Sequence, residues 1–265
     1  MPETVFVKLK QRGLIKISGD DRHSFLQGLI SNDIKLLETQ ASIYTCLLTP
    51  NGKFLFDFFV LQDEPHLILD CEGGTRTEDL ANRLRMYKLR SKVDIEIISE
   101  HDIYAILYAS NTPTNSYPDP RHPDMGGRSL IKPENMTEAE FDVWDEHRIH
   151  LNIPDGSRDM EVEKSTLMEC GIDRLHGISW DKGCYMGQEL TARMNYRGLV
   201  KKSLHAIEFP SGECPPPFSP LTSNDKNIGE MRSSCGAIGI ALLRHEYLDD
   251  PSGLPFTLLK KSKTV

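Results

Sequence analysis

Residues 182–189, Lys-Gly-Cys-Tyr-Met-Gly-Gln-Glu, combine the residue types that could do thiol chemistry. Gly183 and Gly187 stand on either side of Cys184, so the backbone there can turn sharply or approach another group closely. Residues that favour a helix begin at Gln188. A cysteine between a lysine and a helix start meets two conditions that lower a thiol pKa and increase thiolate reactivity. The alternative is a structural cysteine buried in a tight turn, and the residues alone leave both readings open.

Asp57 is a second candidate for chemistry. It stands in an apolar stretch with Phe54, Phe56, Phe58 and Phe59. Burial among aromatic rings should desolvate the carboxylate and raise its pKa toward a range useful for acid–base work. The alternative is an aspartate on an edge strand that points into water.

Two basic segments interrupt an otherwise acidic chain of net charge −8. Residues 82–92 contain five cations, Arg83 and Arg85 among them, and residues 193–202 contain four more, with no acid in either segment. The overall charge argues against a general nucleic-acid binder, because phosphate neutralisation supplies most of such a protein's affinity. The two segments indicate an anionic ligand of limited size, or else ordinary solvated faces.

The composition indicates a globular protein. No apolar run approaches the roughly 18 residues that a membrane span needs, and residues 1–10 lack the apolar core of a signal peptide. The spacing of the six cysteines matches neither a zinc knuckle nor a disulfide framework. We therefore expect free thiols, no bound metal, no membrane contact and a cytoplasmic location.

The first half of the chain predicts alternating strands and helices that would position these residues. A strand at 14–17 leads into a helix at 21–30, and strands at 43–48 and 53–61 flank Asn51-Gly52, a strong hairpin signal. A strand at 66–70 precedes a helix opened by a capping box at Thr75 and Glu78.

The second half predicts further strands at 93–98 and 103–108, then a loop at 110–127 that is rich in proline. A capping box at Thr137 and Glu140 opens a helix with Phe141 and Trp144 facing inward. Short strands with glycine turns after residue 201 predict a small β-barrel. The expected division is a mixed α+β region at 1–200 and a barrel at 201–265.

The motif at 182–189, continuing into Leu-Thr-Ala-Arg, resembles the signature of the YgfZ family of folate-binding iron–sulfur proteins. It is most similar to the branch that contains the mitochondrial iron–sulfur assembly factor. The wider superfamily is that of the glycine cleavage T-protein, an aminomethyltransferase. The resemblance extends over 19–33, 49–57, 168–172 and 229–234. It implies a T-protein-like fold in which two intertwined α/β subdomains form a folate channel and a C-terminal β-barrel follows.

The resemblance also implies roles for single residues. Glu169 would hold the pteridine ring, because one carboxylate can accept two neighbouring N–H groups; the alternative is a helix-capping carboxylate. Asp57 would lie near the folate N5 atom. Tyr185 would stack on the pterin or fill core space, and Trp180 is expected in the core. The other expected cofactor-binding residues are Lys182, Gln188 and Arg193, together with Arg83 and Arg85, which could meet a polyglutamate tail.

The function implied is a tetrahydrofolate-binding protein that supports iron–sulfur cluster assembly or repair. Its partners would be folate, with or without a polyglutamate tail, and iron–sulfur client or assembly proteins, with Cys184 handling a sulfur, iron or one-carbon adduct. One alternative is an aminomethyltransferase of the glycine-cleavage type that transfers a one-carbon unit to tetrahydrofolate. Another is a folate-binding module in tRNA modification. Whether the protein is an enzyme stays open at this stage.

Overall fold

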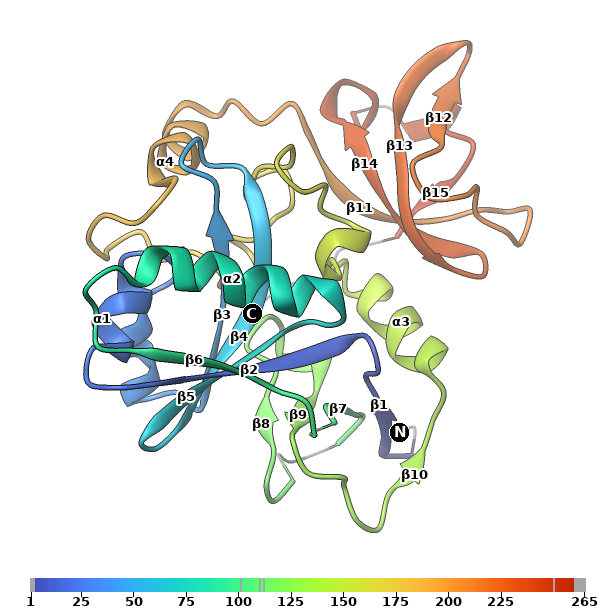
Figure 1. Cartoon of the computed structure of the whole chain (residues 1–265). Coiled ribbons are helices and arrows are strands. Elements are labelled where there is room, and N and C mark those ends of the chain that lie inside the picture. The colour runs from blue at the N-terminus through green and yellow to red at the C-terminus, as the bar shows by residue number, and fades with distance from the viewer. Residues whose placement is uncertain (1–2, 101, 110, 112, 250, 260–265) are drawn as a thin grey trace.

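The computed structural model describes residues 3–100, 102–109, 111, 113–249 and 251–259. The parts of the expected loop and barrel at residues 110, 112, 250 and 260–265 lie outside these ranges. The described chain forms three five-stranded sheets, accompanied by four α-helices and several 3-10 turns (Figure 1).

The first sheet is antiparallel, with the strand order β3-β4-β5-β2-β6. Its strands are β2 (Arg12–Ser18), β3 (Ser42–Leu48), β4 (Phe54–Asp63), β5 (His66–Glu72) and β6 (Asp94–Ile98). The expected hairpin at Asn51-Gly52 is confirmed, because β3 and β4 pair along their length and the Gly52 amide donates to the Thr49 carbonyl at 2.8 Å.

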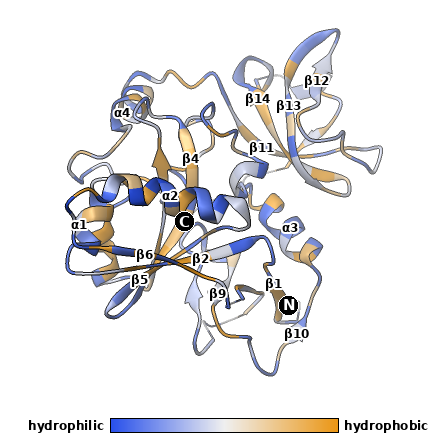
Figure 2. Ribbon diagram, in the orientation of Figure 1, coloured by the Kyte–Doolittle hydropathy of each residue, from blue (hydrophilic) through white to orange (hydrophobic). Residues whose placement is uncertain are grey.

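Two helices cover one face of this sheet (Figure 1). They are α1 (Arg22–Gln27) and α2 (Thr75–Lys88), and the 3-10 turn η1 (Ile34–Glu38) follows α1. Leu80 and Leu84 of α2 pack on the buried side chains of β4 and β5, and Figure 2 shows the helix alternating between hydrophobic and hydrophilic segments. This alternation is what a helix resting on a sheet requires.

Both helices depart from their predicted starts or ends. Helix α1 ends at Gln27 rather than Ile30, because Ile30 bridges to Leu47 and the Ser31 amide donates to the Cys46 carbonyl. The chain thus leaves the helix early to extend the edge of the sheet. The capping box at Thr75 is wrong, since Gly74 occupies the N-cap position and no side chain caps the helix.

The second sheet has the order β10-β1-β7-β9-β8. Its strands are β1 (Val5–Lys8), β7 (Tyr104–Leu107), β8 (Tyr117–Pro118), β9 (Gly127–Ser129) and β10 (Thr137–Glu138). The chain begins in this sheet, crosses to the first sheet at β2 and returns at β7 (Figure 1). The predicted pair of intertwined α/β subdomains is therefore confirmed.

Two local predictions in this region are wrong. The segment expected to be a plain loop at 110–127 contains β8 and the 3-10 turn η2 (Pro123–Met125), and it buries Asp119 and Arg121. Thr137 lies in β10 rather than at a helix cap. The expected helix does form, as α3 (Phe141–His150), and its Trp144 is buried as predicted while Phe141 is half-buried against the same core.

The third sheet is the predicted C-terminal β-barrel, with the order β12-β13-β14-β11-β15. Its strands are β11 (Lys202–Glu208), β12 (Pro220–Ser223), β13 (Lys226–Cys235), β14 (Ile238–Arg244) and β15 (Thr257–Leu258). The 3-10 turns η4 (His245–Tyr247) and η5 (Pro251–Gly253) join its last strands. Helix α3 packs against β13 and β14, and β11 begins five residues after helix α4 (Gln188–Arg197) ends.

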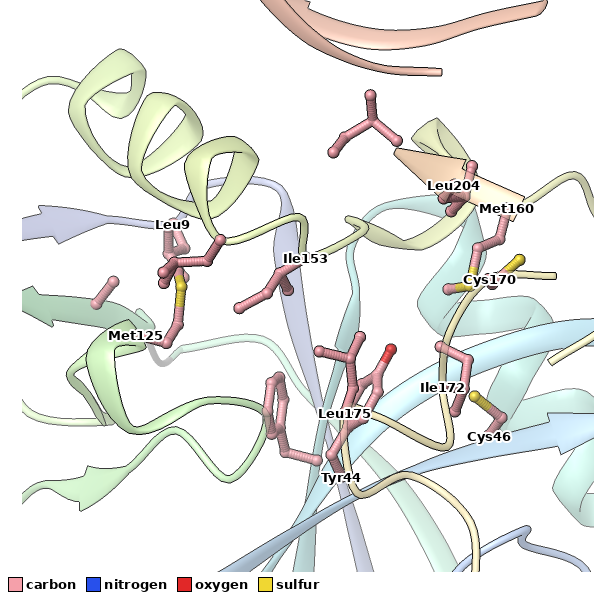
Figure 3. Packing of buried hydrophobic residues seen from close by; sticks show 14 of the residues in the cluster. Leu9, Tyr44, Cys46, Met125, Ile153, Met160, Cys170, Ile172, Leu175 and Leu204 are labelled. Atoms are coloured by element: carbon pink, nitrogen blue, oxygen red, sulfur yellow. The ribbon is translucent and has the colours of Figure 1, made fainter. Parts of the chain in front are cut away.

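The largest core cluster lies between the first sheet and the rest of the molecule (Figure 3). Tyr44 and Cys46 of β3 enter it from the sheet, and Cys170, Ile172 and Leu175 enter from the segment that precedes the motif. Because strand side chains alternate between faces, this cluster occupies the face opposite α1 and α2. Within the described residues, no helix combines the length and apolar character that crossing a membrane requires.

Candidate functional site

The motif forms a short loop that is fixed at its first residue. The Lys182 ammonium group is buried and donates to the carbonyl oxygens of Gln27, Ile30 and Asn32 at 2.7, 2.8 and 2.7 Å. These carbonyls belong to the chain that leaves α1, so the lysine joins the motif to the first subdomain. Burial lowers the pKa of Lys182 to about 8. All three of its donors are engaged by the protein, and this leaves the predicted cofactor contact without structural support.

The loop is fixed again at its other end. Tyr185 is buried in the central core, where burial raises its pKa to about 12, and the Met186 amide donates to the Gly28 carbonyl at 3.2 Å. Tyr185 thus fills core space in this structure, and its stacking on a pterin stays a prediction. Between these anchors, Gly183 has open space around it and Cys184 is exposed. The fold therefore presents a two-residue tip that carries a thiol.

Gly187 brings the motif into close backbone contact with the β3–β4 hairpin. Its φ is +80°, and a Cβ placed on it would lie 2.6 Å from the Thr49 carbonyl oxygen and 2.9 Å from the Gly52 Cα atom. Gly52, with φ +77°, would meet the Gly187 carbonyl oxygen at 2.7 Å in the same way. The two glycines thus let two backbones touch. Gln188 follows as the first residue of α4, half-buried, and its amide lies 3.3 Å from the Tyr185 carbonyl oxygen.

The exposure of Cys184 sets it apart from the other thiols. Cys46, Cys71 and Cys170 are buried, and burial raises their thiol pKa values, to about 12 for Cys71 and Cys170. Partial burial also raises the pKa of Cys214 and Cys235 in the barrel. Cys170 and Cys46 lie in the same buried core (Figure 3), whereas Cys184 faces solvent. The reading of Cys184 as a buried structural cysteine is therefore wrong.

Asp57 faces the central core from β4, with 2% of its surface exposed. The Tyr44 hydroxyl donates to its Oδ2 at 2.9 Å, while its Oδ1 is buried and has no hydrogen-bond partner among the described residues. Burial raises the pKa of Asp57, as expected, and nearby Arg12 opposes that shift. The alternative of a water-facing edge aspartate is wrong, because β4 is an interior strand between β3 and β5.

The ion pairs around Asp57 were not evident from the sequence. Asp70 accepts from the Arg12 Nε atom at 2.7 Å and from the Arg128 Nε atom at 2.8 Å, and all three groups are nearly inaccessible to water. Asp119 and Arg121 pair at 2.7 Å beside them, within the segment expected to be a plain loop. Gly156 lies so close that a Cβ there would sit 3.3 Å from the Asp57 Oδ1 atom.

Glu169 caps a turn rather than a helix, and its role as a pteridine ligand stays a prediction. Its Oε2 accepts from the Thr166 amide at 3.2 Å and from the Thr166 hydroxyl at 2.8 Å, and the Glu169 amide donates to that hydroxyl at 3.4 Å, which is the capping-box pattern at the start of a turn. Its Oε1 lies 3.7 Å from the Lys202 ammonium nitrogen. The carboxylate lines a cavity of about 830 Å³ between the body and the barrel. One oxygen is therefore still available to a ligand.

The remaining predicted ligands lie in different places. Arg83 and Arg85 are on α2, over the face of the first sheet opposite Asp57, and Arg85 donates to Asn82 and to the Ile95 carbonyl. The sheet thus separates them from Asp57. Arg193 is exposed on α4. Trp180, expected in the core, is 38% exposed. The structure therefore groups Lys182, Cys184, Tyr185 and Gln188 but does not bring the arginines of α2 to them.

Comparison with known proteins gives two kinds of match. Residues 201–262 match the C-terminal β-barrel domain of CAF17. Over its length the chain is 28% identical to the mitochondrial iron–sulfur cluster assembly factor IBA57 of Homo sapiens, covering 92% of this chain and 78% of that protein. It is 30% identical to the IBA57 homologue of Mycosarcoma maydis, covering 80% of this chain but 59% of that one.

The glycine cleavage system aminomethyltransferase T of Bartonella henselae has a similar structure, with a TM-score of 0.71 and 12% identity. It covers 92% of this chain and 79% of that protein, and at this identity it shows the fold alone. The expected cytoplasmic location is contradicted, because the IBA57 relatives are named as mitochondrial proteins. The chain is thus similar in sequence to IBA57 iron–sulfur cluster assembly factors, has a fold like that of the T-protein, and matches the CAF17-type C-terminal barrel over residues 201–262.

Proposed function

We propose that this protein supports iron–sulfur cluster assembly or repair, and that Cys184 is its working thiol. The observation that carries the proposal is the exposed tip at Gly183 and Cys184, held between the buried Lys182 and Tyr185. A thiolate is a ligand for iron and an acceptor for sulfur, and it must reach a partner to serve as either. The other described thiols are buried or half-buried, with raised pKa values.

The similarity to named assembly factors supports the same conclusion from a different direction. Their names also locate them in mitochondria, and we propose that compartment for this protein. The client would be an iron–sulfur protein or an assembly partner, and the iron or sulfur would be cargo rather than a resident group. Among the described residues, no group of three or more histidine, cysteine, aspartate or glutamate side chains is arranged to hold a metal ion.

Removal of the gene tests the function class. The proposal predicts reduced activity of iron–sulfur enzymes such as aconitase, with restoration by the wild-type chain. Glycine cleavage is measured as release of CO₂ from labelled glycine in the same mitochondria. Its rate should fall no further than the loss of iron–sulfur enzymes explains. Intact aconitase together with lost glycine cleavage would instead support the aminomethyltransferase alternative.

We propose further that the central core binds tetrahydrofolate, in line with the T-protein-like fold. The residues fit such a group, because the unpartnered Asp57 Oδ1 atom is an acceptor that a pterin N–H could satisfy. Glu169 would offer its Oε1 atom, once that atom is freed from Lys202. When bound, tetrahydrofolate would supply a carrier for one-carbon units. Asp57, with its raised pKa, would exchange a proton with the ligand, and Tyr44 would hold the carboxyl group in place.

Titration with tetrahydrofolate under anaerobic conditions, followed by tryptophan fluorescence, tests this part. Asp57→Asn and Glu169→Gln should each weaken binding by at least about ten-fold, as expected for hydrogen bonds to charged groups. Glu163→Gln, at an exposed carboxylate six residues before Glu169, is the control and should bind like the wild type. Wild-type affinity in both test variants would contradict the folate proposal and leave the role of Cys184 untouched.

A further inference from the structure

Helix α4 has an outer face that the rest of the molecule leaves uncovered. Of its ten residues, Thr191 and Met194 are the two that are buried. At 100° per residue, Glu189, Arg193 and Tyr196 lie on the opposite side of the helix. Tyr196 is 78% exposed, and Leu199, just beyond the helix end, is 45% exposed. Figure 1 shows α4 at the periphery of the body, beside the β3–β4 hairpin. We call Arg193, Tyr196, Arg197, Leu199 and Lys201 the α4 surface.

The α4 surface is positively charged on a chain of net charge −8. Arg193, Arg197 and Lys201 are exposed, and none of them forms an ion pair with a described residue. Glu189 is the acid on the same face, one turn before Arg193. Tyrosine and arginine, which this surface exposes together, are residue types enriched at protein interfaces. The complementary surface would be acidic, because opposite potentials steer association and like charges oppose it.

The α4 surface continues into the cavity of about 830 Å³ between the body and the barrel. Leu199, Val200 and Lys201 form one wall of this cavity, and Arg244 and His245 form another. The acids on its lining are Glu169, which faces Lys202, and Glu246, which faces Arg244. The exposed apolar side chains thus lie next to a concave, largely cationic recess that could receive a protruding acidic segment.

Chain geometry places Cys184 within reach of the same partner. Helix α4 starts four positions after Cys184, which limits the distance between Cys184 and Gln188 to about 14 Å. The helix itself is about 15 Å long. A typical interface covers about 800 Å² on each partner, or a patch roughly 30 Å across. A protein seated on the α4 surface would therefore lie over or beside the thiol.

We propose that the α4 surface is the docking site for an acidic segment of a partner protein, and that docking places this partner beside Cys184. The proposal rests on the proposed function and names the class of partner that function requires. Three unpaired cations favour a protein over RNA, because RNA affinity grows with the number of phosphates neutralised. Tyr196 and Leu199 supply apolar contacts that an acidic protein surface can match.

Charge reversal tests the docking site in the full-length protein. Arg197→Glu combined with Lys201→Glu changes exposed residues only, and Lys10→Glu combined with Lys226→Glu makes the same charge change at exposed lysines elsewhere. A photo-cross-linking amino acid at position 199 should give a protein adduct in mitochondria. Its yield should fall at least about ten-fold in the α4 double variant and in Tyr196→Ala, and stay unchanged in the control. Thermal unfolding confirms that each variant is folded. Equal yields in all variants, or an adduct destroyed by ribonuclease, would overturn the proposal.

Aconitase activity in cells carrying each variant separates this proposal from the proposed function. The α4 double variant should lose both the adduct and aconitase activity, whereas Cys184→Ala should keep the adduct and lose the activity. Full aconitase activity in the α4 double variant would refute the docking site even if Cys184→Ala is inactive. Full activity in Cys184→Ala would refute the role of the thiol, while the adduct would still report on docking.

Discussion

Asp57 shows how a single residue can be buried at a cost to stability. Its Oδ1 atom has no hydrogen-bond donor among the described residues. The Glu72 carboxylate is a near neighbour, because both carboxylates lie close to Gly156. Burial and this neighbouring charge both raise its pKa. Such a group persists in a fold either because it is protonated or because a ligand completes it.

The pH dependence of stability should reveal this cost. Because the folded-state pKa of Asp57 is raised above 3.8, the folded protein holds a proton that the unfolded chain has lost, and stability declines as pH rises through that window. Asp57→Asn cannot ionise and keeps an acceptor for Tyr44. At pH 7 it should be more stable than the wild type, and this gain should shrink toward pH 4. Urea unfolding at several pH values, with exposed Asp63→Asn as the control, measures it; a constant difference would contradict this account.

Lys182 should prove structural when it is replaced. Lys182→Met keeps the length of the side chain but leaves the carbonyl oxygens of Gln27, Ile30 and Asn32 without their donor. The free energy of unfolding should fall by about 2–4 kcal/mol. Lys53→Met removes one donor from the exposed Lys164 carbonyl and should cost less than about 1 kcal/mol. Equal costs in urea denaturation would show that the buried ammonium does not anchor the motif.

The sequence identified Asp57 and the motif, but it could not assign every role. The environment of Asp57 follows from the phenylalanines beside it, so its burial could be predicted locally. The capping box is a local pattern too, yet its bonds formed on a turn at Thr166 and Glu169 and not at the two helices where they were expected. The pairing of Asp70 with Arg128 joins residues 58 positions apart, and no local pattern indicates it.

At the scale of elements, the motif depends on contact between the β3–β4 hairpin and the start of α4. From the sequence we expected Gly183 and Gly187 to have the same role on either side of the cysteine, but in the structure their roles differ. Gly187 allows two backbones to meet, while Gly183 lies in open space. The difference arises from the packing of a hairpin more than 130 residues away, which the motif alone cannot show.

Substitution of each glycine by alanine should separate these roles. Gly187→Ala adds a Cβ that would lie 2.6 Å from the Thr49 carbonyl oxygen and holds alanine at φ +80°. It should destabilise the protein by about 2–4 kcal/mol, since strain and a steric clash combine. Gly183→Ala should change the stability by less than about 0.5 kcal/mol. Thermal unfolding of both variants checks this, and a larger effect for Gly183→Ala would reverse the assignment.

Across the whole molecule, the sequence predicted the order and type of most elements and the barrel that follows them. The domain division at residue 200 stays a prediction. What local patterns could not show is how the barrel is joined to the body. Buried Arg148 of α3 donates to Asp159 at 2.7 Å and to the Ser233 hydroxyl of β13 at 2.6 Å, and Asp159 also accepts from the Ser233 amide. Arg148 and Asp159 are buried at this junction, whereas charged residues are usually expected on the surface.

Removal of Arg148 should therefore weaken the whole fold. Arg148→Met leaves Asp159 as a buried carboxylate without its arginine and removes one of the two arginines that pair with Asp145, and the expected loss is about 3–5 kcal/mol. Arg244→Met breaks an exposed pair with Glu246 and should cost less than about 1 kcal/mol. Urea unfolding compares the two. Similar small losses would show that the junction contributes little to holding barrel and body together.

The central claim is that Cys184 is the thiol through which this protein supports iron–sulfur clusters. The most direct measurement is aconitase activity in cells that lack the endogenous gene and express Cys184→Ala, with Cys235→Ala, a half-buried barrel thiol, as the matched control. Both proteins should accumulate to wild-type levels, since neither side chain is buried in the central core. We expect Cys235→Ala to restore aconitase activity and Cys184→Ala to leave it near the level of the empty vector. Full restoration by Cys184→Ala would contradict the central claim.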